Sequence, residues 1–323
     1  MSAPVSAVPT LRIGTRASAL ALWQARHVQG LIAQAGAASA ELVHIRTEGD
    51  VRTDVPLWQV GGRAFFTKEI DKALLCGDVD IAVHSLKDLS TVLEPGIALA
   101  AVLPREDPRD ALLSASGWLL AQLPQGARVG TSSLRRRAFL ARLRPDLALL
   151  ELRGNVPTRL EQLRAGQYEA IVLATAGLKR LGLEQHISER LSADEFPPAV
   201  SQGAIGVCVR ASDAATLRWV APLDDAATRL ATSAERALLR RIEGGCQVPL
   251  GALGTVNGDL LHLNAAVCAQ DGARMLQAAG KCAATLAEAV GLGRRLAEDL
   301  LSQGAGELIA AQREPPPARE RQS

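Results

Sequence analysis

The chain has 323 residues, of which 48% are hydrophobic, and its formal net charge at pH 7 is only +2. This composition is typical of a globular protein with room for two or three domains. The balanced charge argues against a nucleic-acid partner, and no apolar run approaches the roughly 18 residues that a membrane span needs.

In chain order, the first ten residues lack the basic and apolar segments of a secretory signal, so we expect a cytoplasmic protein without a membrane partner. Short apolar strands then alternate with amphipathic helices. Strands are expected at 11–15, 41–47, 79–85, 127–131, 147–153 and 169–175, and helices at 18–35, 68–77, 132–143, 157–166 and 176–183. This alternation predicts an α/β fold with mainly parallel sheets.

From about Pro222 the pattern changes. A helix is expected at 227–243 and another at 286–304, and between them the segments NGD (257–259) and QDGA (270–273) have the composition of hairpin turns. These elements predict a small α+β unit. The last residues are charged and rich in proline, and we expect 314–323 to be disordered.

One of the five cysteines, Cys246, follows the glycine pair that ends the helix at 227–243, and Pro249 comes shortly after it. The thiol is either a small apolar side chain beyond a helix end or a reactive group presented on a short loop. No CxxC motif or Cys/His ligand spacing occurs, so neither a disulfide framework nor a metal site is expected.

Polar side chains, most of them hydroxyl or basic, lie at or just beyond the ends of five of the predicted strands, where ligands bind in open α/β sheets. They are Thr15, Arg16, Ser18, His84, Ser85, Lys87, Asp88, Thr131, Ser132, Ser133, Arg135, Arg136, Arg153, Asn155, Arg159, Lys179 and Arg180. Arginine pairs bidentately with carboxylate or phosphate, and no phosphate-binding glycine motif is present. The pattern therefore predicts a polycarboxylate site with one acid, Asp88.

Each of these residues also has a structural explanation. The hydroxyls at 131–133 suit a helix N-cap, Lys87 and Asp88 suit a surface ion pair, and Arg159 suits a pair with a nearby glutamate. Two other functions also remain open. The arginine-rich helix at 135–144 would suit a nucleic-acid binder, and hinged α/β domains also serve as solute receptors.

Several segments, in order from Leu11 to Leu253, resemble the porphobilinogen deaminase (hydroxymethylbilane synthase) family. They include RIGTRASALALWQA, DIAVHSLKDL, REDPRDALLS, VGTSSLRRRAFL, LRGNVPTRL, SQGAIGV and EGGCQVPLGA. The resemblance implies a transferase of porphyrin and heme biosynthesis. Such an enzyme condenses four porphobilinogen molecules head to tail, releases ammonia and forms hydroxymethylbilane. A covalent dipyrromethane cofactor primes the reaction.

The resemblance also implies the architecture. The family fold has two α/β domains of the type II periplasmic-binding-protein kind, joined by a hinge, and a small C-terminal α+β domain. Domain 1 is then expected at 1–103 with a return segment at 204–221, domain 2 at 104–203 and domain 3 at 222–313. The family suggests a monomer.

By motif match, Asp88 is the catalytic aspartate and Cys246 carries the dipyrromethane through a thioether. The residues implied to bind carboxylates are Arg16, Ser18, Lys87, Thr131, Ser132, Ser133, Arg135, Arg136, Arg153, Arg159 and Arg180. The family's mobile loop would contain Gly61, Gly62, Arg63 and Phe66. Three residues depart from the family pattern. Pro157 replaces a small residue, and Arg63 stands where lysine is frequent. Ser90 replaces a proline and is expected to loosen the turn behind Asp88.

Overall fold

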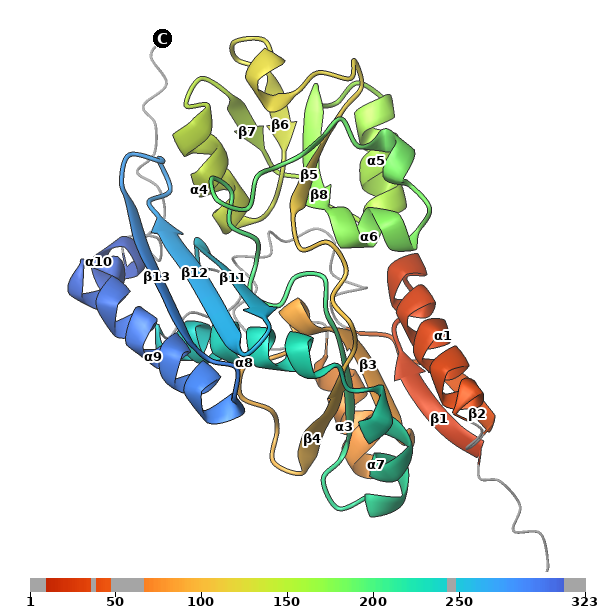
Figure 1. Cartoon of the computed structure of the whole chain (residues 1–323). Helices are drawn as coiled ribbons and strands as arrows, with labels where there is room; N and C mark the ends of the chain where they lie inside the picture. Colours follow the sequence, from red (N-terminus) through yellow and green to blue (C-terminus); the bar gives the residue numbers. More distant parts are fainter. Residues whose placement is uncertain (1–9, 36–38, 48–66, 243–247, 311–323) are drawn as a thin grey trace, which may run out of the picture.

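The computed structural model describes residues 10–35, 39–47, 67–242 and 248–310, which form three β-sheets with their helices (Figure 1). The first sheet has the strand order β2-β1-β3-β10-β4. Its strands are β1 (Thr10–Thr15), β2 (Ser39–His44), β3 (Ile81–Ser85), β4 (Ile97–Val102) and β10 (Ile205–Arg210). The helical segments beside it are α1 (Ala19–Gln34), α3 (Lys68–Cys76), η1 (Leu86–Asp88), α7 (Ala214–Val220) and η4 (Ala221–Leu223).

The second sheet repeats this arrangement with the order β7-β6-β8-β5-β9. Its strands are β5 (Asp110–Ser114), β6 (Arg128–Gly130), β7 (Ala148–Leu150), β8 (Ala170–Ala174) and β9 (Glu189–Arg190). The helical segments are η2 (Leu120–Gln122), α4 (Leu134–Leu143), α5 (Val156–Arg164), α6 (Thr175–Arg180) and η3 (Glu184–His186). In each sheet three parallel strands are followed by an antiparallel one, β10 in the first and β5 in the second.

The third sheet is antiparallel, with the strands β11 (Leu250–Asn257), β12 (Leu260–Cys268) and β13 (Met275–Ala283). Both predicted hairpin turns are confirmed. Helices α8 (Ala226–Arg241) and α9 (Leu286–Ser302) contribute Leu238 and Leu296 to the core of this unit, and α10 (Ala305–Ala310) ends the described chain.

The predicted fold class is confirmed: two α/β halves of the periplasmic-binding-protein kind, plus a small α+β unit. The chain crosses from the first half to the second between β4 and β5, and it returns between β9 and β10. Four strands were not predicted, namely β4, β5, β9 and β10. The strands of each sheet fall within the expected domain ranges, although the boundaries themselves stay a prediction, and 314–323 lie outside the described residues.

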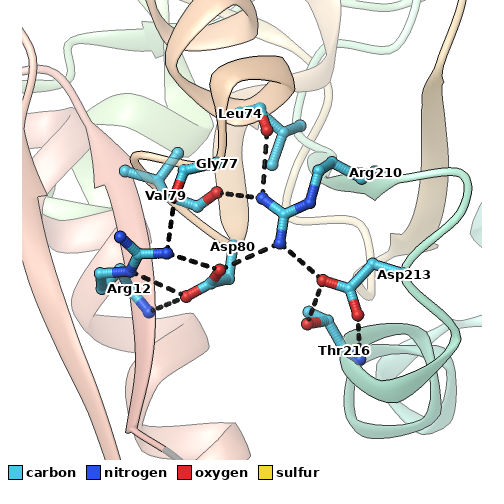
Figure 2. A network of polar contacts seen from close by, with 8 residues as sticks. All are labelled: Arg12, Leu74, Gly77, Val79, Asp80, Arg210, Asp213 and Thr216. Atoms are coloured by element: carbon cyan, nitrogen blue, oxygen red, sulfur yellow. Dashed lines mark hydrogen bonds and ion pairs between the residues drawn. The ribbon is translucent and has the colours of Figure 1, made fainter.

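An ion-pair network lies at the end of the first sheet where β1 and β3 begin and β10 ends (Figure 2). Asp80 accepts hydrogen bonds from Arg12 of β1 and Arg210 of β10, each with a donor 3.0 Å from Oδ1. Arg210 also donates to Asp213, which caps α7 by accepting from the Thr216 amide at 3.0 Å. Burial alone would raise the pKa of Asp80, but the bonds from Arg12 outweigh burial and the pKa is lowered.

A second buried acid has the opposite environment. Asp71 of α3 lies with Oδ1 3.6 Å from Nε2 of His84 on β3, and both side chains are buried. Burial raises the pKa of Asp71 to about 6, and the charges of Glu94 and Glu69 act in the same direction. Burial and the charge of Arg16 lower the pKa of His84 to about 4, so the imidazole is neutral at pH 7 and no ion pair offsets the buried carboxylate.

Replacing Asp71 with asparagine is therefore expected to stabilise the protein at neutral pH. The unfolded chain has an ordinary carboxyl pKa, so above about pH 6 the folded state alone bears the cost of a desolvated charge. The Asp71→Asn variant should exceed the parent's free energy of unfolding by roughly 2–3 kcal/mol at about pH 7.5, and this gain should shrink toward zero near pH 4. Urea unfolding at several pH values measures the difference.

Asp80→Asn is the matched control, because its carboxyl pKa is lowered rather than raised. It should destabilise the protein at neutral pH, and its cost should shrink as the pH falls through the lowered pKa. An Asp71→Asn variant that is less stable than the parent at about pH 7.5 would contradict the description of this buried site.

Candidate active site

The turn after β3 presents Lys87 and Asp88, both half-buried. The fully buried Leu86 anchors it, and the Leu86 amide donates to the carbonyl of Ala204 at 3.0 Å. Lys87 donates from Nζ to Oε1 of Gln202 at 3.3 Å. Within the part of the chain that the structure describes, no ion pair joins Lys87 to Asp88, so the surface-pair explanation of these two residues does not hold.

Arg236 of α8 holds this turn from behind. Its guanidinium donates to the carbonyl of Leu89 at 3.0 Å and to the carbonyls of Leu86 and Ser90. The turn is thus clamped by a charged donor from the C-terminal unit. One of the three carbonyls that Arg236 contacts is that of Ser90, the residue that replaces a proline. The guanidinium thus holds the turn at the position where we expected it to be looser.

The start of α4 carries two arginines that converge on one buried acid, Asp110, the first residue of β5. Arg135 Nη2 lies 2.6 Å from Asp110 Oδ2, and Arg136 Nε lies 2.9 Å from Oδ1. Each arginine also donates to a backbone carbonyl, Arg135 to Pro197 and Arg136 to Val172. Burial would raise the pKa of Asp110, but the charges of Arg135 and Arg136 outweigh it and lower the pKa to about 2.

The predicted hydroxyl residues have local partners. Ser133 caps α4 by accepting from the Arg136 amide, and Ser18 caps α1 by accepting from the Ala21 amide. Ser132 donates to the carbonyl of Leu152, and buried Thr131 accepts from the Ser133 amide. The capping explanation therefore holds for Ser133, and the structure adds a capping role for Ser18, which the sequence analysis did not predict. The ligand-binding roles of all four residues stay predictions.

Four further arginines lie at the ends of other strands. Arg159 of α5 donates to the Gly154 carbonyl at 2.7 Å, and its pKa is lowered to about 10 by burial and by the charges of Arg136 and Arg153. Arg180 of α6 donates to the Gly203 carbonyl at 2.6 Å, and its guanidinium lies 5.6 Å from the ring centroid of Trp23 on α1. Burial lowers the pKa of Arg180 to about 10. Arg16 is half-buried beyond β1, and Arg153 is half-buried beyond β7.

Four of the predicted side chains lie close enough together for their charges to interact: Lys87, Asp88, Arg136 and Arg159. The charge of Asp88 acts on the pKa of both Lys87 and Arg159, and the charge of Arg136 acts on the same two groups. Lys87 itself has a pKa lowered to about 8, by burial first, despite the opposing influence of Asp88. Two α/β halves thus supply several partly buried cations around two acids. A surplus of buried positive charge is costly unless an anion compensates it.

Some predicted residues cannot be placed. Gly61, Gly62, Arg63, Phe66 and Cys246 lie outside the described residues.

The structure also adds residues that were not predicted: Asp110, Gln202, Trp23 and Arg236. Asp110 was detectable in principle, since an acid directly before the apolar run ALLS is unusual in a strand covered on both faces. Gln202 has no comparable sequence signal.

The fold and the described side chains define a class: a two-halved α/β protein whose strand ends carry partly buried cationic side chains around one acid, Asp88, that no arginine among the described residues binds. Among the described residues, no cluster of three or more His, Cys, Asp or Glu side chains is arranged to hold a metal ion. None of the described helices is both long and apolar enough to span a membrane.

Comparison with known proteins narrows this class. Residues 11–218 match the family model described as porphobilinogen deaminase, dipyrromethane cofactor binding domain, and residues 229–302 match the model for the C-terminal domain of the same enzyme. The chain belongs to the porphobilinogen deaminase family. It is accordingly an enzyme of tetrapyrrole synthesis that uses porphobilinogen as substrate and dipyrromethane as cofactor.

Individual relatives agree. A porphobilinogen deaminase of Roseiflexus sp. (strain RS-1) is 54% identical over 302 residues, covering 93% of this chain and 99% of the relative. One from Syntrophotalea carbinolica is 51% identical, covering 93% and 95%. Solved structures with a similar fold include the alkanesulfonate-binding protein of Xanthomonas axonopodis pv. citri, at 14% identity and a TM-score of 0.36, covering 74% of this chain and 77% of that one. Another is the aliphatic sulphonate-binding protein of Escherichia coli, at 15% and 0.38, covering 72% and 74%.

Proposed function

We propose that this protein condenses four porphobilinogen molecules head to tail into hydroxymethylbilane, with its site built from the strand-end residues described above. The observation that carries the residue assignment is the surplus of partly buried cations around Asp88. Each porphobilinogen bears an acetate and a propionate, so a growing chain accumulates carboxylates. Arginine forks match those groups in charge and geometry.

The donor set fits a dipyrromethane. Its acidic side chains require cations that are not already neutralised, and the lowered pKa values of Lys87, Arg159 and Arg180 mark groups with too little internal counter-charge. When bound, the cofactor supplies the anchored pyrrole to which substrate units are added. Arg16, Ser18, Thr131, Ser132, Ser133, Arg135, Arg136 and Arg153 are proposed to complete the carboxylate-binding set.

Asp88 is proposed as the catalytic acid residue. Loss of ammonia from the substrate leaves positive charge on its pyrrole, and a carboxylate fixed nearby stabilises that charge as it develops. The same oxygens can accept pyrrole N–H bonds and take up a proton. The fixed turn serves this role, since Leu86 and Arg236 hold the backbone that presents the carboxylate.

Cys246 is proposed to attach the cofactor, and the loop containing Phe66 is proposed to be the mobile loop near the site. The protein is further proposed to act as a cytoplasmic monomer without nucleic-acid or membrane partners, as the balanced charge of the sequence supports.

The proposal predicts a covalent adduct. The purified protein should exceed its sequence mass by two pyrrole units, and addition of porphobilinogen should release ammonia and give further mass steps of one unit each. Mass spectrometry of the intact protein and an ammonia assay measure both. Protein that has the bare sequence mass after reconstitution with porphobilinogen, and that releases no ammonia, would overturn the proposed function.

A further inference from the structure

Gln202 lies on the segment that returns from the second sheet to the first, and its side chain is buried. The backbone around it is unusual. Ser201 has a φ of 63°, and Gly203 has a φ of 93° with no room for a side chain, because a Cβ there would lie 2.3 Å from the Glu106 carbonyl oxygen. Glu235 of α8 accepts from the Ser201 amide. Backbone strain of this kind persists where the surroundings impose it, often at functional sites.

The contacts of the Gln202 amide fix its orientation. Nε2 donates to the Pro108 carbonyl at 2.8 Å and to Asp110 Oδ1 at 3.1 Å, whereas Oε1 accepts from Lys87 Nζ at 3.3 Å. A flipped amide would place its oxygen against a carboxylate and its NH₂ against an ammonium group, so only one orientation satisfies all three partners. Gln202 thereby joins the acid that holds Arg135 and Arg136 to the residue next to Asp88.

The charges around Lys87 come from three elements. Asp88 lies on its own turn, Arg135 and Arg136 face it from α4, and Asp110 faces it from β5. These four charges cancel in sum. The direct hydrogen-bond acceptor of Lys87 is a neutral amide, which orients the ammonium group but does not neutralise it.

We propose that Gln202 is a positioning residue: it holds the Lys87 ammonium group between the two sheets through a neutral acceptor, so that Lys87 remains available to a carboxylate of the ligand. The identity of that ligand rests on the proposed function, whereas the coupling of Gln202 to Lys87 does not. A carboxylate at position 202 would bind Lys87 internally and compete with the ligand for it.

The test measures how readily Lys87 reacts with acetic anhydride as a function of pH, in the full-length protein with its cofactor and without substrate. Only the neutral amine reacts, so the pH dependence of labelling in the peptide that contains Lys87 reports its titration. Gln202→Glu should shift this titration upward by about one pH unit or more, because an opposite charge is added at hydrogen-bond distance. Gln202→Leu should shift it downward, because the acceptor is lost. Gln29→Leu, which removes a side-chain bond from α1 to the Ala40 carbonyl of β2, should leave it unchanged.

Steady-state kinetics provide a second measurement. Gln202→Glu should raise KM for porphobilinogen by roughly tenfold while lowering kcat less, as expected for a lost carboxylate contact. The two Gln202 variants are expected to shift the Lys87 titration in opposite directions, so either variant alone tests the inference if the other does not fold. Unchanged Lys87 titration in a folded Gln202 variant overturns the inference whatever the activity. If the Lys87 titration shifts in the variants but the unsubstituted parent protein makes no tetrapyrrole, the inference is supported and the proposed function is rejected.

Discussion

Replacing Cys246 with alanine is expected to give a folded protein of bare sequence mass that makes no hydroxymethylbilane. Alanine offers no sulfur to form the thioether, so no pyrrole chain can be anchored for elongation. The measurement is the mass of the intact protein, together with colour formation with an aldehyde reagent for pyrroles. Cys246 itself lies outside the described residues, and the expectation depends on its place in the EGGCQVPLGA motif.

The described thiols make poor substitutes. Burial raises the pKa of Cys208 to about 12 and that of Cys268 to about 11, so neither forms an appreciable amount of thiolate at neutral pH. Cys76 is exposed on the last turn of α3, and Cys282 lies on β13 of the C-terminal unit. Cys76→Ala and Cys282→Ala are therefore matched controls that should retain the adduct. A Cys246→Ala protein that still carries a stable dipyrrole would move the attachment site elsewhere.

Replacing Asp88 with asparagine is expected to abolish nearly all ammonia release while leaving the fold intact. The substitution preserves size and hydrogen bonding but deletes the charge that would stabilise a cationic pyrrole, and the loss of one such preorganised contact commonly costs a hundredfold or more in turnover. Stability should change little, because Asp88 is half-buried and forms no ion pair with Lys87 in the described structure. Rates of ammonia release and the melting temperature measure the two effects.

Asp146→Asn is a suitable control for this substitution. Asp146 pairs with Arg144 at 2.7 Å just before β7 begins, whereas the predicted site residues follow the ends of strands. Because solvent-accessible ion pairs contribute little, its loss should change stability little and leave turnover near the parent value. An Asp88→Asn variant within a few-fold of parental activity would remove Asp88 from the mechanism.

The sequence predicts the parallel strands and their helices well because their signals are local. The alternation of apolar runs with amphipathic segments identifies β1, β3, β6 and β8 and the helices that follow them. The antiparallel strands are harder to find. β10 pairs with β3 and β4, more than one hundred residues earlier in the chain, and such pairing leaves no periodic signal in its own residues.

The site residues also divide into those that a local sequence pattern predicts and those that depend on tertiary contacts. Placement of basic residues after strands predicts that Lys87, Arg136 and Arg159 come together, and the mutual influence of their charges agrees with that prediction. The roles of Asp110 and Gln202 depend on which groups share a buried space. That information lies in the tertiary contacts between β5, α4 and the return segment, so no short motif contains it.

The pairing of Asp110 with Arg135 and Arg136 also restricts how such a chain can diverge over generations. A lineage that loses the acid first buries two adjacent guanidinium groups without their shared counter-charge, and breaking a buried pair in this way costs roughly 3–5 kcal/mol. A lineage that loses Arg135 first retains a carboxylate still paired with Arg136. The three positions therefore do not mutate independently: the order of substitutions matters, and the acid is the last of the three that drift can remove.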